Sequence, residues 1–230
     1  MMCRTSITRW PENLSRAALL VTLAVLAACS SDGGGRTVTE QRGVDAFHSI
    51  DLRGAADVRV TVGAATSVSL TAGTETLQGI GTRVENDVLI IDSKPGWRWI
   101  GDSGRLEVQI GMPVLNALAV NGAGNVTITG VHGAALALAL QGTGNLTASG
   151  QTAALNARIN GAGSMNLAQL VAGDASIVVN GTGSLAANVS GSLEATVNGV
   201  GSITYSGNPQ KVESQIHGVG SITPAKPSGG

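Results

Sequence analysis

The stretch Asn121-Gly-Ala-Gly-Asn125 decides the fold that we expect for this chain. Copies of this motif, each a Gly-x-Gly corner followed by Asn or Ser, begin again at positions 141, 160, 180, 198 and 217. The spacing between successive copies is therefore nearly constant. Six copies at such a period indicate an array of stacked repeats, in which each repeat contacts only its neighbours.

The sequence on both sides of each corner alternates between apolar and polar residues. For example, Leu155-Asn-Ala-Arg-Ile159 precedes the third copy, and Met165-Asn-Leu167 follows it. A period of two residues is typical of β-strands, because successive side chains of a strand point to opposite faces. Two short strands and two turns in every repeat predict an all-β fold. The specific form that we expect is a parallel β-helix, a solenoid with coils of about 19–20 residues.

The corner glycines have a structural explanation. A tight corner needs positive φ or a close approach of neighbouring coils, and glycine permits both. We expect this role for Gly122, Gly124, Gly142, Gly144, Gly161, Gly163, Gly181, Gly183, Gly199, Gly201, Gly218 and Gly220. Asn121, Asn160, Asn180 and Asn198 begin four of the corners and are expected to stack amide upon amide. The Asn or Ser that follows each corner suits local turn hydrogen bonds.

The N-terminal segment 1–28 has the features of a bacterial export signal. Three arginines and one glutamate precede Ala17–Ala28, an almost wholly apolar run that is too short to cross a bilayer. The run leads into Leu26-Ala-Ala-Cys29, which resembles a lipobox. By that resemblance Cys29 is the lipid anchor and the first residue of the mature lipoprotein, with palmitate attached. The alternative is an ordinary signal peptide in which Cys29 has no role.

These features divide the chain into three parts. Residues 1–28 are expected to be a lipoprotein signal peptide, and residues 29–43 a flexible tether rich in Gly, Ser and polar residues. The β-rich domain is expected over 44–226, with irregular coils and a hairpin over 44–110 and regular repeats over 111–226. Ser rather than Asp follows Cys29, which resembles an outer-membrane sorting signal if the cell has two membranes. We therefore expect a lipid-anchored location in the cell envelope.

Composition excludes several classes of function. A formal net charge of −1 and a charged fraction of 13% leave no basic face of the kind that nucleic acid requires. Aromatic residues are 2% of the chain, so the core must be built from Val, Ile, Leu and Ala. Two cysteines and three histidines exclude a zinc site made of several cysteines. We expect no metal, no cofactor and no nucleic-acid partner.

Several motifs together resemble the GIN-domain family, which is described as the head of bacterial autotransporter adhesins. They are Phe47-x-x-Ile50, Gly54-Ala-Ala-Asp-Val58, Arg105-Leu-Glu-Val-Gln-Ile110 and the closing Gly-Val-Gly-Ser-Ile-Thr-Tyr-Ser-Gly-x-Pro that ends at Pro209. The resemblance covers roughly residues 44–209. It implies a β-helix and an envelope location, and it implies no reaction. The family often has Asp after the Gly-x-Gly corner, whereas all six copies here have Asn or Ser, which argues against a cation site at that position.

The residues of the repeats do not favour an enzyme. Glycoside hydrolysis needs two carboxylates at a fixed separation. The acids of the repeats, Asp174, Glu194 and Glu213, fall one to a coil and at different places in it. We therefore expect no catalytic residue. The preferred interpretation is a binding or scaffold module that resembles an adhesin, and the alternatives are a carbohydrate-active β-helix enzyme and a purely structural envelope protein.

The best candidate for ligand contact is an insertion that contains Trp97, Arg98 and Trp99. Exposed Trp side chains can stack on sugar rings or on a protein partner. The interpretation that we favour for the loop is nevertheless that one or both Trp side chains plug an open end of the solenoid, which must be covered to protect its edge strands. The expected partners are thus the membrane, through lipid on Cys29, and a glycan or an envelope protein.

Overall fold

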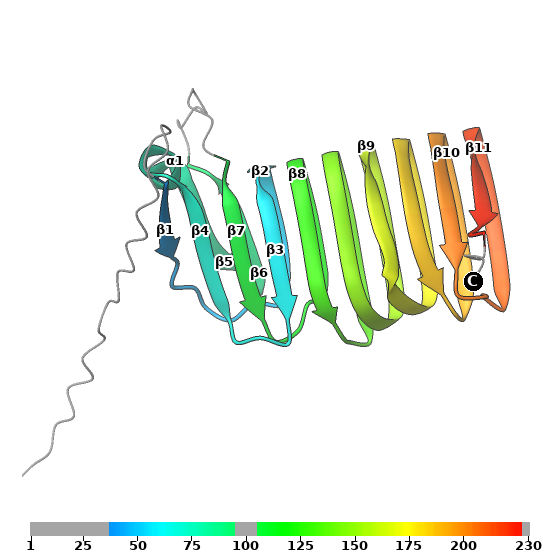
Figure 1. Ribbon diagram of the computed structural model, residues 1–230, viewed down its shortest axis with the longest axis horizontal. Helices are drawn as coiled ribbons and strands as arrows, with labels where there is room; N and C mark the ends of the chain where they lie inside the picture. The colour runs from blue at the N-terminus through cyan, green and yellow to red at the C-terminus, as the bar shows by residue number, and fades with distance from the viewer. Residues whose placement is uncertain (1–36, 95–104, 227–230) are drawn as a thin grey trace, which may run out of the picture. The chain divides into compact units, whose positions relative to one another are not determined.

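The computed structural model describes residues 37–94 and 105–226, which form an all-β domain apart from one short helix (Figure 1). In chain order the elements are β1 Thr37–Gln41, β2 Ser49–Ala55, β3 Asp57–Val62, β4 Ser67–Gly73, α1 Thr74–Gly79, β5 Ile80–Glu85, β6 Val88–Ser93, β7 Glu107–Met112, β8 Ala117–Val131, β9 Ala135–Val189, β10 Ser192–Ser206 and β11 Lys211–Pro224. The all-β prediction is confirmed. Among the described residues no helix is long and apolar enough to cross a membrane.

The repeats stack on one another in register. β8, β9, β10 and β11 pair in parallel, and each repeat places its corner on the corner of the next. Gly122 pairs with Gly142, and Gly199 pairs with both Gly181 and Gly218. Figure 1 shows these strands side by side, from green β8 to red β11. The period of the motif in the sequence is therefore the length of chain between paired positions.

The N-terminal part of the sheet departs from this regular stacking. β2 and β3 both pair with β8, and they continue the parallel arrangement by one step. Beyond them, β6 pairs with β2 and β7 pairs with β3, again in parallel. The outermost strands are antiparallel, since β5 pairs with β6, β4 with β7, and β1 with β4. Antiparallel strands and helix α1 therefore lie at the N-terminal end of the stack.

One segment differs from its expected structure. Residues 37–41 fall within the expected flexible tether, but they form β1 and pair with Ser69–Gly73. The sequence Thr-Val-Thr-Glu-Gln explains the strand, because three consecutive β-branched residues favour extended backbone and the two polar residues after them tolerate an exposed edge. Arg42, next in the chain, donates from its guanidinium to the carbonyl of Leu77 in α1. The ordered domain thus begins earlier than the expected boundary at Val44.

The core is a set of aliphatic columns along the stack. Val120, Leu140, Ile159, Val179 and Val197 occupy the position just before the corner in five successive repeats. Each of these side chains is at most 1% exposed. Phe47, the only Phe of the chain, is also buried at 1% exposure. The expectation of a core made from Val, Ile, Leu and Ala is confirmed.

The corners are places where backbones of neighbouring repeats meet closely. Gly142 has φ of +142°, and a Cβ added there would lie 2.1 Å from the carbonyl oxygen of Gly122. Gly163, the second glycine of its corner, lacks a positive φ, but an added Cβ would still lie 2.6 Å from the oxygen of Gly144. At Gly142 glycine therefore serves both conformation and packing, and at Gly163 it serves packing alone.

Amide side chains form a ladder along one side of the corners. The Asn180 Nδ2 donates to Asn160 Oδ1 at 2.7 Å, and the Asn198 Nδ2 donates to Asn180 Oδ1 at 2.8 Å. This confirms the expected stacking of amides. At the N-terminal end, Asn121 Nδ2 instead donates to Asp51 Oδ1 at 2.7 Å. Arg53 forms an ion pair with the same Asp51. At that end of the ladder the acceptor is therefore a carboxylate that is already paired with an arginine.

A second ladder runs along the other side of the corners, where we expected local turn bonds. Asn145 Nδ2 donates to Asn125 Oδ1 at 3.0 Å, and Ser164 Oγ donates to Asn145 Oδ1 at 3.0 Å. The expectation was wrong, because in-register stacking brings equivalent side chains to the spacing of adjacent strands, about 4.8 Å. This ladder also ends on an acid, since Asn125 Nδ2 donates to Asp57, which pairs with Arg105.

Candidate functional site

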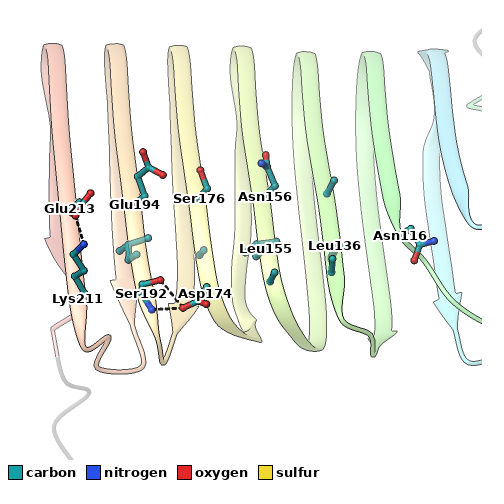
Figure 2. Close-up of a pocket in the computed structure, with 15 residues that line it drawn as sticks. Asn116, Leu136, Leu155, Asn156, Asp174, Ser176, Ser192, Glu194, Lys211 and Glu213 are labelled. Carbon is teal, nitrogen blue, oxygen red and sulfur yellow. Dashed lines mark hydrogen bonds and ion pairs between the residues drawn. The ribbon is translucent and has the colours of Figure 1, made fainter.

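A groove with a volume of about 520 Å³ crosses six repeats on the face formed by the strands that precede the corners (Figure 2). It is lined by Asn116, Ala135, Leu136, Ala137, Ala154, Leu155, Asn156, Asp174, Ala175, Ser176, Ser192, Leu193, Glu194, Lys211 and Glu213. These residues come from β9, β10, β11 and the segment before β8. Because the strands are hydrogen-bonded to their neighbours on both sides through most of this face, the groove has a regular frame.

The groove follows from the alternation of the strands. Leu136, Leu155 and Leu193 point inward and are at most 3% exposed. The side chains on either side of them in sequence point outward, and several are small, as at Ala135 and Ala154, both of which are exposed. Alanine at outward positions leaves space above the sheet that larger side chains would fill. The hollow is thus a direct result of small residues at alternating positions.

The chemistry of the groove changes along the stack. Its lining at 135–137 and 154–155 is alanine and leucine, whereas Asp174, Glu194 and Glu213 line it from the last three repeats. We expected these three acids to be differently placed in their coils. The register bears this out for Asp174, which lies against Ser192, two positions before Glu194, but it pairs Glu194 with Glu213. Stacking therefore gathers all three acids in one groove, and only Lys211 opposes them among its lining residues.

Asp174 is held in place by the neighbouring repeat. Its Oδ1 accepts hydrogen bonds from the Ser192 backbone N–H at 2.8 Å and from the Ser192 hydroxyl at 2.6 Å. Gly191 leaves room for the carboxylate, since an added Cβ would lie 2.6 Å from the same oxygen. The hydrogen bond from the Ser192 side chain, followed by that from its backbone, holds the pKa of Asp174 below its usual value.

Removing the Ser192 hydroxyl is expected to raise the pKa of Asp174 toward the ordinary value of about 3.9. Because the folded pKa is lowered, this interaction stabilises the fold above that ordinary value and is lost as pH falls through the lowered one. The Ser192→Ala variant should therefore show a higher Asp174 pKa in a carboxyl NMR titration. Ser176→Ala, which removes a hydroxyl from the same groove, is the matched control. An unchanged Asp174 pKa in Ser192→Ala would contradict this account.

A second charged pair lies at the C-terminal end of the groove. Lys211 Nζ donates to Glu213 Oε1, and both side chains are more than half exposed. The hydrogen bond and the charge of each partner raise the pKa of Lys211 and lower the pKa of Glu213. Exposed pairs of this kind contribute little to stability. Their effect here is to fix the position of a positive and a negative group at the mouth of the groove.

The residues that the sequence singled out for function lie outside the described residues. Cys29 belongs to the segment before β1, and Trp97, Arg98 and Trp99 belong to the connection between β6 and β7. The structure accounts only for the corner glycines. The groove was missed, because the outward alanines at 135, 137 and 154 are visible in the sequence but indicate a hollow only once the repeats are stacked. No group of three or more metal-ligating side chains occurs in the described ranges.

Comparison with known proteins places the chain in a family. The family model described as "Putative auto-transporter adhesin, head GIN domain" matches residues 46–209. The chain belongs to the GIN-domain family. The resemblance seen in the sequence is confirmed by this match, which covers most of the described domain. No curated protein matches this GIN-domain sequence.

Solved structures similar to this GIN-domain chain support the same fold. A "putative adhesin" from Bacteroides fragilis NCTC 9343 has a TM-score of 0.70 and 21% identity, covering 83% of this chain and 97% of that one. A "putative adhesin" from Parabacteroides merdae ATCC 43184 has a TM-score of 0.57 and 20% identity, with 84% and 98% covered. A "putative lipid binding protein" from Parabacteroides distasonis ATCC 8503 has a TM-score of 0.50 and 20% identity, with 85% and 99% covered. At these identities the likeness concerns the fold alone.

Proposed function

We propose that this GIN-domain chain is an adhesin-like binding module of the cell envelope, anchored by lipid on Cys29, whose groove contacts an envelope or surface glycan. The observation that carries the proposal is the groove itself, an open hollow that crosses six repeats of a regular stack. Membership of a family described as an adhesin head supports the envelope location.

We further propose that the domain is a parallel β-helix. In-register parallel pairing of Leu193 with Ala175 and of Leu193 with Val212 supports this assignment. Each step of the stack uses one repeat of roughly 20 residues, which is enough for two strands and two turns. The coils then act as a rigid frame, and successive coils supply equivalent positions of the groove at intervals of about 4.8 Å.

The anchor follows from residues 1–29. A signal peptide over 1–28 would direct export, and acylation of Cys29 would hold the domain at a membrane, the outer membrane if the cell has two. Cys29→Ser should abolish acylation and release the protein from the membrane fraction, because each buried methylene of an acyl chain contributes about 0.8 kcal/mol to membrane binding. Fractionation and intact mass measure the change. Cys3→Ser, which removes the other cysteine, should leave both unchanged, and membrane retention of Cys29→Ser would contradict the anchor.

A glycan fits the groove better than a strongly charged ligand. The groove presents hydroxyl and amide groups at Ser176, Ser192 and Asn156, which can donate to and accept from sugar hydroxyls. The carboxylates that line it add acceptors for further sugar hydroxyls or amino groups. The alanines at the other end provide an apolar floor. Stacking on aromatic rings would have to come from Trp97 and Trp99, if their loop reaches the ligand.

Binding without catalysis is the proposal that we favour. Asp174 has a lowered pKa and is therefore a poor general acid near neutral pH. The Glu213 pKa is lowered as well, by Lys211. Retaining and inverting glycosidases both need one carboxyl with a raised pKa, so neither acid suits that role. Turnover of a bound glycan by the wild-type chain would contradict this proposal and would favour the carbohydrate-active enzyme.

The glycan proposal is tested by filling the groove. Ala154 is exposed and lines the groove, so Ala154→Trp should block it without disturbing the core. We expect the full chain to retain solubilised cell-wall glycan, and Ala154→Trp to reduce its affinity at least about tenfold. Thr127→Trp places the same side chain at an exposed position of β8 that does not line the groove, and it should bind as wild type. Equal glycan affinity of the two variants would contradict the proposal that the groove binds the glycan.

The Trp97 and Trp99 loop is a separate arm of the same test. If the loop contributes to binding, Trp97→Ala with Trp99→Ala lowers glycan affinity while the melting temperature holds. If the side chains plug an end of the stack, the double variant loses about 3 kcal/mol or more of stability. A double variant with unchanged binding and stability would assign neither role to the loop.

A further inference from the structure

The two ends of the stack differ in how their strand edges are covered. At the N-terminal end the outermost strands are β1 and β5, which are short and carry charged or polar side chains. On β5, Arg83 pairs with both Glu85 and Asp92. Short, charged edges are the usual protection of a sheet against further pairing. At the C-terminal end, β11 pairs only with β10 among the described residues, so the whole length of this strand presents an uncovered edge.

Two of the three inward positions before the corner of β11 are apolar, and both are open; the third, Ser214, pairs with the buried Ala195. Val212 pairs with Leu193, and Ile216 pairs with Val197, so they belong to the same columns of the core. Leu193 is 1% exposed and Val197 is 0% exposed, whereas Val212 is 40% exposed and Ile216 is 44% exposed. At these two positions the last described repeat therefore has apolar inward residues like those of an internal repeat, and in the described domain nothing covers them.

The apolar surface continues around the corner of this repeat. Val219 lies at the tip and is 73% exposed, and Val200, which pairs with it, is 55% exposed. The charges on β11 do not protect the edge, because Lys211 and Glu213 pair with each other. A long edge with apolar inward residues and internally neutralised charge favours pairing with another strand.

We propose that β11 pairs antiparallel with β11 of a second copy, around a two-fold axis at Ser214. In this register Val212 of one copy faces Ile216 of the other, so the open core positions cover each other. Glu213 of one copy faces Gln215 of the other, and Lys211 faces His217. Apolar side chains meet apolar ones, polar meet polar, and no two like charges stand directly opposite. The edge is thus complementary to itself.

The two-fold arrangement is preferred over head-to-tail stacking. Head-to-tail contact would pair β11 with β1 or β5 of the next copy, and it would leave another β11 edge free, which generates an open filament. The charged and polar edges at the N-terminal end disfavour that contact. A two-fold dimer pairs the uncovered β11 edges of the two copies with each other and leaves no such edge for a third copy. We therefore expect assembly to stop at a dimer.

Cross-linking tests the register directly. Residues directly opposite in an antiparallel pair have Cα atoms about 4.5–5.5 Å apart, which lies within the range that a disulfide spans. Full-length Ser214→Cys should therefore form a covalent dimer on mild oxidation in cells, seen on a non-reducing gel. Thr66→Cys introduces a cysteine at another exposed position, near the other end of the stack, and should remain at the wild-type background. Equal cross-linking at both positions would overturn the proposal.

Mass measurement tests the edge without a cross-link. Ile216→Lys places a charge among the open core positions and should convert the dimer to a monomer in light scattering of the full chain in detergent. Gln215→Lys adds the same charge at the next position, where it would face Glu213 of the other copy, and should remain dimeric. Circular dichroism confirms that both variants are folded, and the Ser214→Cys result stands independently of them.

Three outcomes would overturn the dimer. A wild-type chain that is monomeric up to about 100 μM would show that the edge does not pair with itself at useful affinity. A mass that grows without limit as concentration rises would show head-to-tail filaments. Cross-linking of Ser214→Cys only to other envelope proteins would assign the edge to a foreign strand.

Discussion

Gly142→Val is expected to cost the domain more than about 3 kcal/mol of unfolding free energy. The reason is twofold. Valine is strained at the φ of +142° that Gly142 adopts, and its Cβ would lie 2.1 Å from the Gly122 oxygen and 3.0 Å from the Gly122 carbonyl carbon. These atoms are backbone and belong to the neighbouring repeat, so the clash can be relieved only by separating two paired strands. Denaturant unfolding of wild type and variant measures the difference.

The control for this experiment is Gly133→Val. Gly133 lies between β8 and β9, where an added Cβ meets nothing within 4 Å, and its φ lies outside the left-handed region. We expect a change within about 0.5 kcal/mol there, as is usual for surface substitutions. Equal effects of the two substitutions, or a loss below about 0.5 kcal/mol at Gly142, would show that the corners do not depend on close approach.

Phe47→Ala is the second substitution with a large expected effect, a loss of about 3–5 kcal/mol. Phe47 is 1% exposed and belongs to the hydrophobic core at the end of the stack that departs from the repeats. Few large side chains are available to fill the cavity, because aromatic residues are only 2% of the chain. Thermal or denaturant unfolding measures the loss.

Phe47→Leu keeps most of the buried volume and should cost no more than about 1.5 kcal/mol. A Phe47→Ala variant as stable as Phe47→Leu would contradict the burial of this side chain. Together the two variants separate the loss of volume from the loss of the aromatic ring.

The repeats could be predicted from sequence because their information is local and recurs. Each Gly-x-Gly corner marks the same position in its repeat, so the spacing of the corners sets which residues pair, as Gly199 does with Gly218. Alternation around each corner identifies the inward residues, and the amide ladder follows from the column of Asn residues. No long-range information is needed beyond the period.

The N-terminal strands could not be predicted in the same way. β3 and β7 pair Asp57 with Glu107, which are far apart in sequence, and neither strand carries a mark of its partner. Helix α1 was not anticipated either, since its N-cap residue Gly73 makes no side-chain capping bond and the helix is very short. Burial of Leu77 against the core, rather than local propensity, accounts for it.

The groove could be predicted from the sequence only in part. The small outward residues Ala135 and Ala154 were visible in the sequence, but alanine at an outward position has no meaning until the neighbouring coils are placed. Asp174 and Glu194 belong to different repeats and line the same groove only because the repeats stack in register. A surface that crosses several repeats is therefore hidden from motif reasoning, which works along the chain.

The central claim is that the groove contacts a glycan, and mapping the contact by amide chemical shifts tests it most directly. The measurement titrates the full chain in detergent micelles with soluble cell-wall glycan fragments. The account predicts shifts concentrated at residues 135–137, 154–156, 174–176 and 192–194, which line the groove on successive repeats. Shifts confined to other surfaces, such as the corners or residues 37–94, would contradict it.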